Sequence, residues 1–213
     1  MTSETFAART EADVIGLVQG QSLAWIVSES SGSPCATLLP MLPVLENGTI
    51  TALAGHFARS NPHVQILETA PRVLILFLGS HGYISPSWMS DRTQAPTWNY
   101  ASAQFDADVE LFEGPVRIEA HLRELVSANE AGRPKSWSIE EMGPRYRSLS
   151  RRVVGFIAQV CTARARFKLG QDERDDVFRD ICRGLEQEQP QDHSRGLLNW
   201  MREFNPHRGE GEQ

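Results

Sequence analysis

The strongest constraint on the fold is a strict alternation of side-chain types over residues 101–111. Small or apolar residues stand at every odd position, and polar or charged residues stand at every even position. Because successive side chains of a β-strand point to opposite faces, the pattern predicts a long strand with one face on the core. Gly114 and Pro115 follow and end it. The domain is therefore expected to contain antiparallel sheet.

Other segments predict further strands. Residues 22–28 and 36–42 have strand composition around a turn-rich stretch, which predicts a hairpin with a rather long loop. Asn47-Gly48 is a strong hairpin signal ahead of a strand over residues 49–54. The continuous apolar run of residues 72–79 is typical of a central strand covered on both faces. Together these segments predict an antiparallel meander.

Residues 153–169 predict a second long strand. From Cys161 to Leu169 the apolar residues share one face and the cationic residues share the other, whereas the first half is out of phase unless a bulge intervenes. The cationic row either binds an anion or pairs with the acidic residues of the strand over 101–111. Cross-strand pairing is favoured for Arg164 and Arg166.

Apolar residues at helical spacing predict helices over residues 10–20, 118–126, 172–185 and 192–204. Residues 131–150 are expected to be irregular with short helical turns, and residues 208–213 to be a mobile tail. We therefore expect an α+β domain built on a small antiparallel barrel with peripheral helices. Residues 1–190 form this domain, and residues 191–213 add a C-terminal helix and the tail.

Composition excludes several classes of protein. At 213 residues with 40% hydrophobic content, the chain supports one main core. The net charge of −6 argues against an extended DNA-binding face, although a local basic patch stays possible. Three widely spaced cysteines fit a reducing cytoplasm and form no metal or disulfide pattern. The longest apolar run, residues 73–78, is too short to cross a membrane.

Two stretches are candidate binding sites. Residues 82–100 carry four aromatic side chains, two prolines and several hydroxyl and amide groups between two predicted strands, as binding loops often do. Residues 55–62 are interpreted as a tight helical turn, with Asn61 either ending it or capping a new helix that begins at Pro62. Backbone N–H groups and Arg59 there suit a phosphate. Alternatively, Arg59 is a surface cation and His56 a packing residue.

Motifs of the major enzyme classes are absent from the sequence. It contains no P-loop, no dinucleotide-binding glycine pattern after a strand, no nucleophile elbow and no His and carboxylate spacing suited to a metal. These absences exclude most hydrolase and kinase interpretations.

Four motifs together resemble a known family. Residues 55–62 (GHFARSNP), 83–88 (YISPSW), 96–100 (PTWNY) and 168–171 (KLGQ) have the order and approximate spacing seen in PaiB-like proteins. That family consists of FMN-binding split-barrel proteins, often described as negative transcriptional regulators. The resemblance extends from near the N-terminus to about residue 185.

The resemblance implies an antiparallel six-stranded split β-barrel that forms a homodimer, with FMN at the subunit interface. It assigns the ribityl phosphate to Arg59, with His56, Ser60 and Asn61 as neighbours. It assigns the isoalloxazine side to Ser85, Trp88, Thr97, Trp98 and Asn99, and it lets Lys168 and Gln171 close the pocket. A flavin needs such flat walls, edge donors and cations at its phosphate. Each tryptophan is equally consistent with a packing role.

The sequence also departs from the family pattern. Met89 stands where relatives tend to have Tyr after the Ser-Pro-Ser-Trp motif, and residues 170–172 replace the usual Ser-Gln-Asn. The N-terminal Tyr-x-Pro pattern is absent as well. These changes bear on the detail of the pocket and on flavin affinity more than on the fold.

Three functional hypotheses follow. The protein is a flavin-binding regulator, an FMN-dependent oxidoreductase acting with a reduced nicotinamide or a small substrate, or a haem-related split-barrel protein. The oxidoreductase has only His56 and Tyr83 as candidate acids or bases. The surroundings of His81 and His121 show no axial-ligand context for haem.

Overall fold

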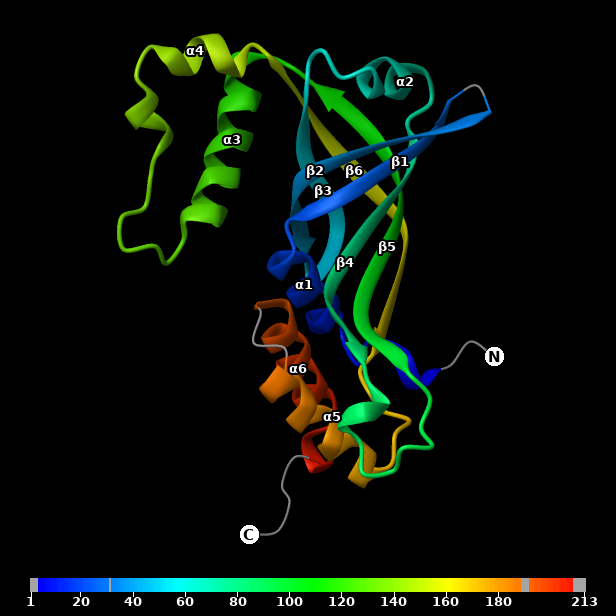
Figure 1. The fold of residues 1–213 in the computed structure, drawn as a ribbon. Coiled ribbons are helices and arrows are strands. Elements are labelled where there is room, and N and C mark those ends of the chain that lie inside the picture. Colours follow the sequence, from blue (N-terminus) through cyan, green and yellow to red (C-terminus); the bar gives the residue numbers. More distant parts are fainter. Residues whose placement is uncertain (1–3, 31, 189–191, 209–213) are drawn as a thin grey trace. The chain divides into compact units, whose positions relative to one another are not determined.

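The fold is built on six antiparallel strands. The computed structural model describes residues 4–30, 32–188 and 192–208. The strands form a closed barrel in the order β1-β2-β3-β6-β5-β4 (Figure 1). Their bounds are β1 Leu23–Ser30, β2 Ser33–Glu46, β3 Thr49–Ala58, β4 Arg72–Ile84, β5 Thr97–Phe112 and β6 Val153–Lys168. The predicted six-stranded fold is confirmed.

Six α-helices and four short 3₁₀ helices are described besides the strands. The α-helices are α1 Glu11–Gly20, α2 His63–Thr69, α3 Pro115–Glu130, α4 Arg145–Ser150, α5 Asp175–Glu188 and α6 Asp192–Phe204. The 3₁₀ helices are η1 Glu4–Phe6, η2 Pro86–Trp88, η3 Ile139–Met142 and η4 Pro206–Arg208. None of these helices is long and apolar enough to cross a membrane.

The chain forms two compact units. Unit 1 comprises residues 1–17, 78–103 and 165–213, and unit 2 comprises residues 18–77 and 104–164. Strands β4, β5 and β6 each contribute residues to both units. The prediction of one domain over residues 1–190 and a separate C-terminal segment stays a prediction.

Unit 2 has an aromatic core inside the meander. Phe57 and Phe156 lie with ring centroids 5.1 Å apart, and Phe77 meets Phe105 edge to face at 5.8 Å. Asn47 and Gly48 both have positive φ, as the predicted two-residue hairpin between β2 and β3 requires. The alternation over residues 101–111 produces the expected inward row on β5, in which every residue is buried except the half-buried Leu111.

Two turns differ from their predictions. The hairpin between β1 and β2 is tight rather than long, because Ser30 already pairs with Ser33. Residues 55–58 are not a helical turn, since β3 continues through them in register with β6. Pairing with a strand about a hundred residues away satisfies these backbone groups, and this long-range partner is not visible in local composition. The chain turns over Arg59, Ser60 and Pro62, before α2 begins at His63.

Strand β6 also differs from its prediction. Its first half buries Val154, Phe156 and Ala158. Phe167 near its end and Leu169 just beyond it are buried as well, so the inward face changes between the two halves. Cys161 and Ala163, predicted to face the core, are exposed. Arg164 pairs with Asp106 as expected, at 3.0 Å, but Arg166 lies over the ring of Phe6 instead of pairing with an acidic residue.

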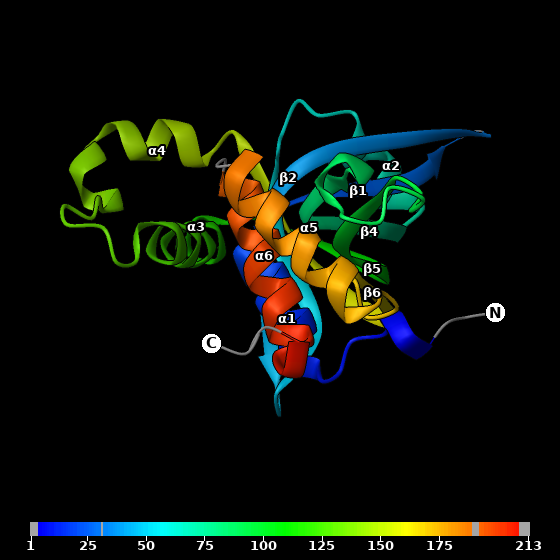
Figure 2. The same ribbon diagram turned by 60° about the horizontal axis from the view of Figure 1, so that its bottom comes forward.

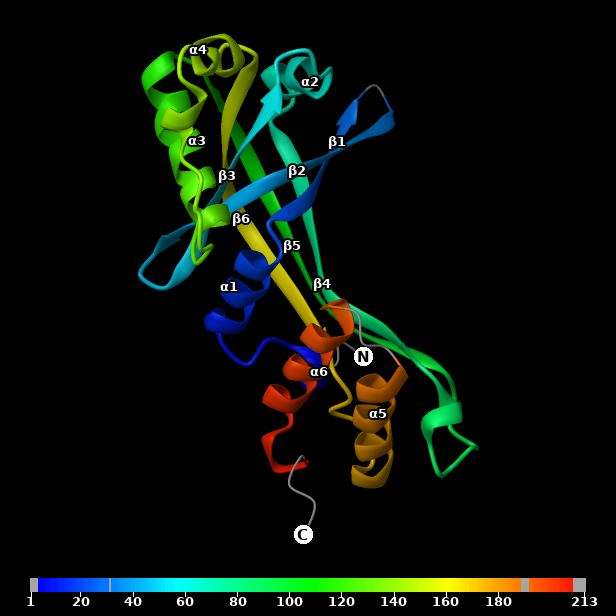
Figure 3. The same ribbon diagram turned by 60° about the vertical axis from the view of Figure 1, so that its left-hand side comes forward.

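Unit 1 is held together by α5 and α6, which lie side by side (Figures 2 and 3). The predicted apolar stripe of α5 is buried along its whole length. The ring of Phe167 stacks on that of Phe204, with the ring centroids 4.9 Å apart. The Arg9 guanidinium lies over the Phe204 ring, 3.8 Å from its centroid. The mobile tail predicted for residues 208–213 is wrong at Arg208, which donates to the carbonyl oxygens of Gly170 and Glu173. Residues 209–213 of that tail lie outside the described residues.

Candidate functional site

Arg59 lies at the turn that follows β3 in unit 2. Its guanidinium donates to Glu113 Oε1 at 2.6 Å and to the carbonyl oxygens of Arg151 and Val153. The hydrogen bond from Arg59 lowers the pKa of the Glu113 carboxyl. Arg59 is therefore a positioned cation rather than a free one, and a phosphate there would share it with Glu113.

A cleft of about 590 Å³ adjoins Arg59 within unit 2. It is lined by the start of α3, by α4 and by the residues that lead into β6, namely Arg59, Gly114, Pro115, Ile118, Glu119, Tyr146, Arg147, Ser150, Arg151 and Val153. Its volume is typical of small-molecule sites. Arg59 is the only residue of this lining that the sequence predicted to bind a ligand. The clustered arginines and tyrosine of residues 145–151 were the available sequence signal.

His56 has a structural partner. Its Nδ1 shares a hydrogen bond of 3.1 Å with Nε2 of His121 on α3, a buried residue. Burial lowers the pKa of both rings, that of His121 to about 4 with a further contribution from the charge of His56. The pair is thus expected to be neutral at pH 7, which fits the packing interpretation of His56. His121 was not predicted as its partner.

Of the other two residues on this turn, only Ser60 is exposed. Asn61 Oδ1 accepts the backbone N–H of His63, and its Nδ2 lies 3.4 Å from Thr37 Oγ1. Asn61 thus bonds to the first residue of α2, but Pro62 holds the N-cap position and makes no side-chain cap, so the alternative in which Asn61 caps a helix beginning at Pro62 is not confirmed. His63 itself is fully buried between Ser28 Oγ at 2.7 Å and Thr37 Oγ1 at 2.9 Å.

An exposed aromatic group lies in unit 1. The Trp98 side chain is 54% exposed and the Tyr83 side chain 40%. Their rings meet edge to face with centroids 5.9 Å apart. The ring of His81 belongs to the same group, with its centroid 6.4 Å from that of Trp98. Large aromatic faces left in solvent are uncommon and often mark a binding surface.

Lys168 places a cation beside this aromatic group. Its Nζ donates to Thr97 Oγ1 and, at 3.2 Å, to the carbonyl oxygen of Trp98. Gln171 is engaged in the turn after β6, where it accepts from Leu169 N and donates to Phe167 O. Thr97, Trp98 and Lys168 are therefore brought together, while Gln171 shapes the turn behind them.

The remaining predicted contacts are packed against helices. Ser85 Oγ accepts the N–H of Ser87 and begins η2. Trp88 lies against Gly184 of α5, where a Cβ in place of the glycine hydrogen would come within 2.3 Å of the indole ring. Asn99 is buried, with Nδ2 3.6 Å from the Met201 sulfur. Trp88 and Asn99 hold the loop onto unit 1, and their assignment to the flavin stays a prediction.

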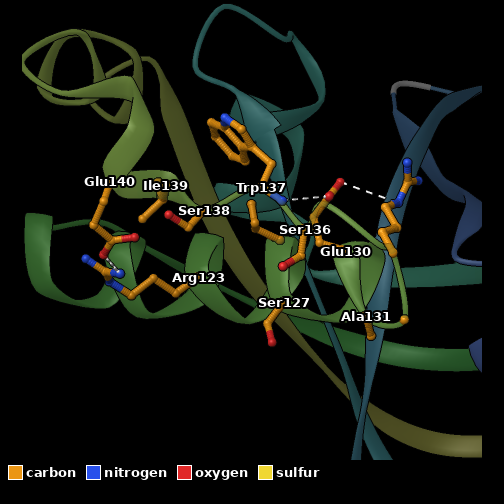
Figure 4. Close-up of a pocket in the computed structure, with 12 residues that line it drawn as sticks. Arg123, Ser127, Glu130, Ala131, Ser136, Trp137, Ser138, Ile139 and Glu140 are labelled. Atoms are coloured by element: carbon orange, nitrogen blue, oxygen red, sulfur yellow. Dashed lines mark hydrogen bonds and ion pairs between the residues drawn. The ribbon is translucent and has the colours of Figure 1, made fainter.

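A second hollow of unit 2, of about 450 Å³, lies between α3 and the segment that follows it (Figure 4). Its charged side chains are already paired. Arg123 bonds to Glu140 and Glu119, and Glu130 accepts the backbone N–H of Trp137 at 2.9 Å. An anionic ligand would have to break these pairs, so the cleft beside Arg59 is the better candidate for a phosphate.

The residues fit a flavin in their chemistry. Unit 1 offers flat, exposed aromatic faces with a lysine beside them, and unit 2 offers a cleft with arginine side chains. The first combination suits an isoalloxazine ring with polar edges, and the second suits a phosphate.

Comparison with known proteins gives the same assignment. Residues 1–162 match a family model described as "Putative FMN-binding domain". The chain is 29% identical over 185 residues to "Protease synthase and sporulation protein PAI 2" of Bacillus subtilis (strain 168), covering 86% of this chain and 88% of that protein.

Solved structures share the fold. The FAD and Heme binding protein from Mycobacterium smegmatis has a TM-score of 0.57 at 16% identity, over 83% of this chain and 79% of that one. The conserved hypothetical protein Rv2991 from Mycobacterium tuberculosis has a TM-score of 0.56 at 14% identity, over 79% and 91%. The chain therefore belongs to the PaiB-like family of split-barrel proteins described as "Putative FMN-binding domain", and FMN is the cofactor of that family.

Proposed function

We propose that the protein is a homodimeric FMN-binding protein of the PaiB-like regulator type, which responds to FMN or to its redox state. The observation that carries the proposal is the exposed aromatic pair of Trp98 and Tyr83 beside Lys168. In this proposal the flavin ring lies on that aromatic group of unit 1. The assignment of the phosphate to Arg59 stays a prediction from the family resemblance. Direct DNA contact is not part of the proposal, because the net charge is −6.

An apolar surface on unit 2 supports the homodimer. Trp25 of β1 pairs with Leu38 of β2 and with Leu76 of β4, so the three side chains form one row on the outer face of the barrel. Trp25 is 48% exposed, and Leu38 and the neighbouring Leu23 are exposed as well. A contiguous apolar row on an outer face is typical of a protein interface. The proposed partner is a second copy of the chain, as in the family.

A cytoplasmic location is also part of the proposal. Cys35, Cys161 and Cys182 are all free thiols, as expected for a protein kept in a reducing compartment. The test compares protein purified with and without reductant. Intermolecular disulfides through the exposed Cys161 should form only in the absence of reductant.

The cofactor assignment is tested by the absorbance spectrum and mass identification of whatever co-purifies, followed by titration of cofactor-free protein with FMN. We expect a flavin spectrum and a rise in melting temperature with added FMN. Trp98→Ala should weaken FMN binding about 3- to 10-fold, since an aromatic pair contributes roughly 0.5–1.5 kcal/mol. Trp137→Ala is the matched control, because Trp137 is also partly exposed but lies in the hollow beside α3. A colourless protein that gains no stability from FMN would refute the assignment.

One observation favours an FMN-dependent oxidoreductase as the second candidate. The exposed Tyr83 stands against Trp98, on the surface assigned to the flavin ring, and carries an ionisable hydroxyl. His56 is a weaker candidate acid or base because His121 engages it. FMN-dependent oxidation of a reduced nicotinamide that falls in Tyr83→Phe would establish the enzyme, and absence of turnover would favour the regulator.

A further inference from the structure

The cleft beside Arg59 is lined by more positive charge than Arg59 alone supplies. Besides Arg59 it is lined by Arg147 on α4 and by Arg151 directly after that helix. Both side chains are exposed, and neither takes part in an ion pair within the ranges that the structure covers. The one carboxylate of the lining, Glu119, is paired with Arg123 at 2.7 Å. In a protein of net charge −6, this local excess of unpaired arginine side chains favours the binding of an anion.

Tyr146 adds a hydroxyl group without a partner. Its Oη is buried and makes no hydrogen bond of ordinary geometry among the residues that the structure describes. Burial raises its pKa, although Ser150 of the same cleft lies near enough to lower that pKa slightly against the rise. A buried hydroxyl that lacks a partner costs free energy, so such groups usually serve a ligand or an ordered water. Tyr146 lines the same cleft as the arginines.

The first turn of α3 completes the lining. Gly114 precedes the helix with φ 96° and offers no side-chain cap, so the first N–H groups of this 16-residue helix lack a capping side chain. A Cβ added at Gly114 would meet nothing within 4 Å, so the approach to this end of the helix is open. The positive end of a helix dipole favours an anion at this position.

We propose that this cleft, here called the arginine cleft, binds a phosphoryl group through Arg147, Arg151 and the Tyr146 hydroxyl. If the phosphoryl group is that of FMN, the inference rests on the proposed function. Arg59, the predicted phosphate ligand, lines the same cleft. A second phosphorylated ligand is the other source of the same chemistry. Bidentate guanidinium groups, a neutral hydroxyl donor and a helix N-terminus together suit a dianion better than a carboxylate.

The test uses full-length protein with its cofactor removed. Arg147→Gln/Arg151→Gln is compared with wild type and with Arg145→Gln/Arg195→Gln, which removes two exposed positive charges outside the cleft. Each protein is titrated at constant ionic strength with FMN and with riboflavin, which lacks the phosphate. Binding of inorganic phosphate is followed by ³¹P NMR with and without saturating FMN. Tyr146→Phe is a second, milder variant that retains the ring packing.

We expect the cleft variant to bind FMN at least about tenfold more weakly than wild type. Its affinity for riboflavin should stay unchanged, and so should the affinity of the control variant for FMN. Unchanged FMN binding with loss of phosphate binding to FMN-loaded protein would assign the cleft to a second phosphorylated ligand and also support the inference. If neither FMN nor phosphate binding changes, or the control loses as much, the inference is overturned.

The same data separate this inference from the proposed function. Wild-type protein that binds no flavin but binds phosphate, and loses that binding in the cleft variant, would refute the proposed function and leave the arginine cleft supported. Wild-type protein that binds neither flavin nor phosphate would refute both.

Discussion

The pair formed by His56 and His121 makes the stability of the protein dependent on pH. His121 is 6% exposed, and its Nε2 lies 3.1 Å from His56 Nδ1. Burial, and then the charge of His56, lower the pKa of His121 to about 4. A group whose pKa is lowered on folding stabilises the folded state above its unfolded pKa, and this stability is lost as the pH falls.

The size of the effect follows from the two pKa values. In the unfolded chain His121 titrates near its ordinary value of about 6.5, so it is almost wholly protonated at pH 5. In the folded protein, with a pKa of about 4, only about one molecule in ten is protonated at that pH. Between pH 7 and pH 5 this difference lowers the free energy of unfolding by about 2 kcal/mol.

The assay is urea unfolding of wild type and of His121→Gln at pH 7 and pH 5. Gln cannot titrate but keeps an amide that can bond to His56. Between pH 7 and pH 5 the free energy of unfolding of the variant should fall by about 2 kcal/mol less than that of wild type. Burial also lowers the pKa values of His56 and His63, but both proteins share these contributions, so they cancel to first order. Protein concentration is held constant, because a dimer unfolds in a concentration-dependent way.

His207→Gln is the control for this experiment, since His207 is exposed. It should follow the wild-type pH dependence. If His121→Gln also follows wild type to within about 0.5 kcal/mol, His121 takes up a proton readily in the folded protein and the reasoning from burial is wrong.

Three further predictions concern the interface and the packing of the loops. Trp25→Ser should shift the proposed dimer towards monomer in sedimentation equilibrium, because burying the exposed half of Trp25, on the order of 100 Å², would contribute about 2.5 kcal/mol per subunit. Val116→Ser, an exposed apolar change on α3, should not. Asn61→Ala should lower the free energy of unfolding by about 1 kcal/mol through loss of the hydrogen bond that Asn61 Oδ1 accepts from the His63 N–H; an unchanged urea midpoint would show that this bond does not stabilise the fold. Gly184→Ala should destabilise by about 1–3 kcal/mol despite better helix propensity, because its Cβ would stand 2.3 Å from Trp88; a rise in melting temperature would show that the indole does not pack there.

The strands and helices were largely predictable from the chain alone because each depends on periodicity. The period of two over residues 101–111 and the helical spacing in α5 and α6 both report which side chains face a core. The hairpin at Asn47-Gly48 was predictable because positive φ is tolerated by few residues. The family motifs added the six-stranded split form of the barrel and the cofactor, which periodicity cannot supply.

The sequence thus determined most of the secondary structure, the fold class and the family, since these depend on local spacing and on short motifs. Only the tertiary structure showed that β3 runs on through His56, that His121 is the partner of His56, and that Arg147 and Arg151 line one cleft with Arg59. The physical reason is that such contacts join residues about 65 to 100 positions apart. Their formation depends on strand register and helix placement, which no local pattern encodes.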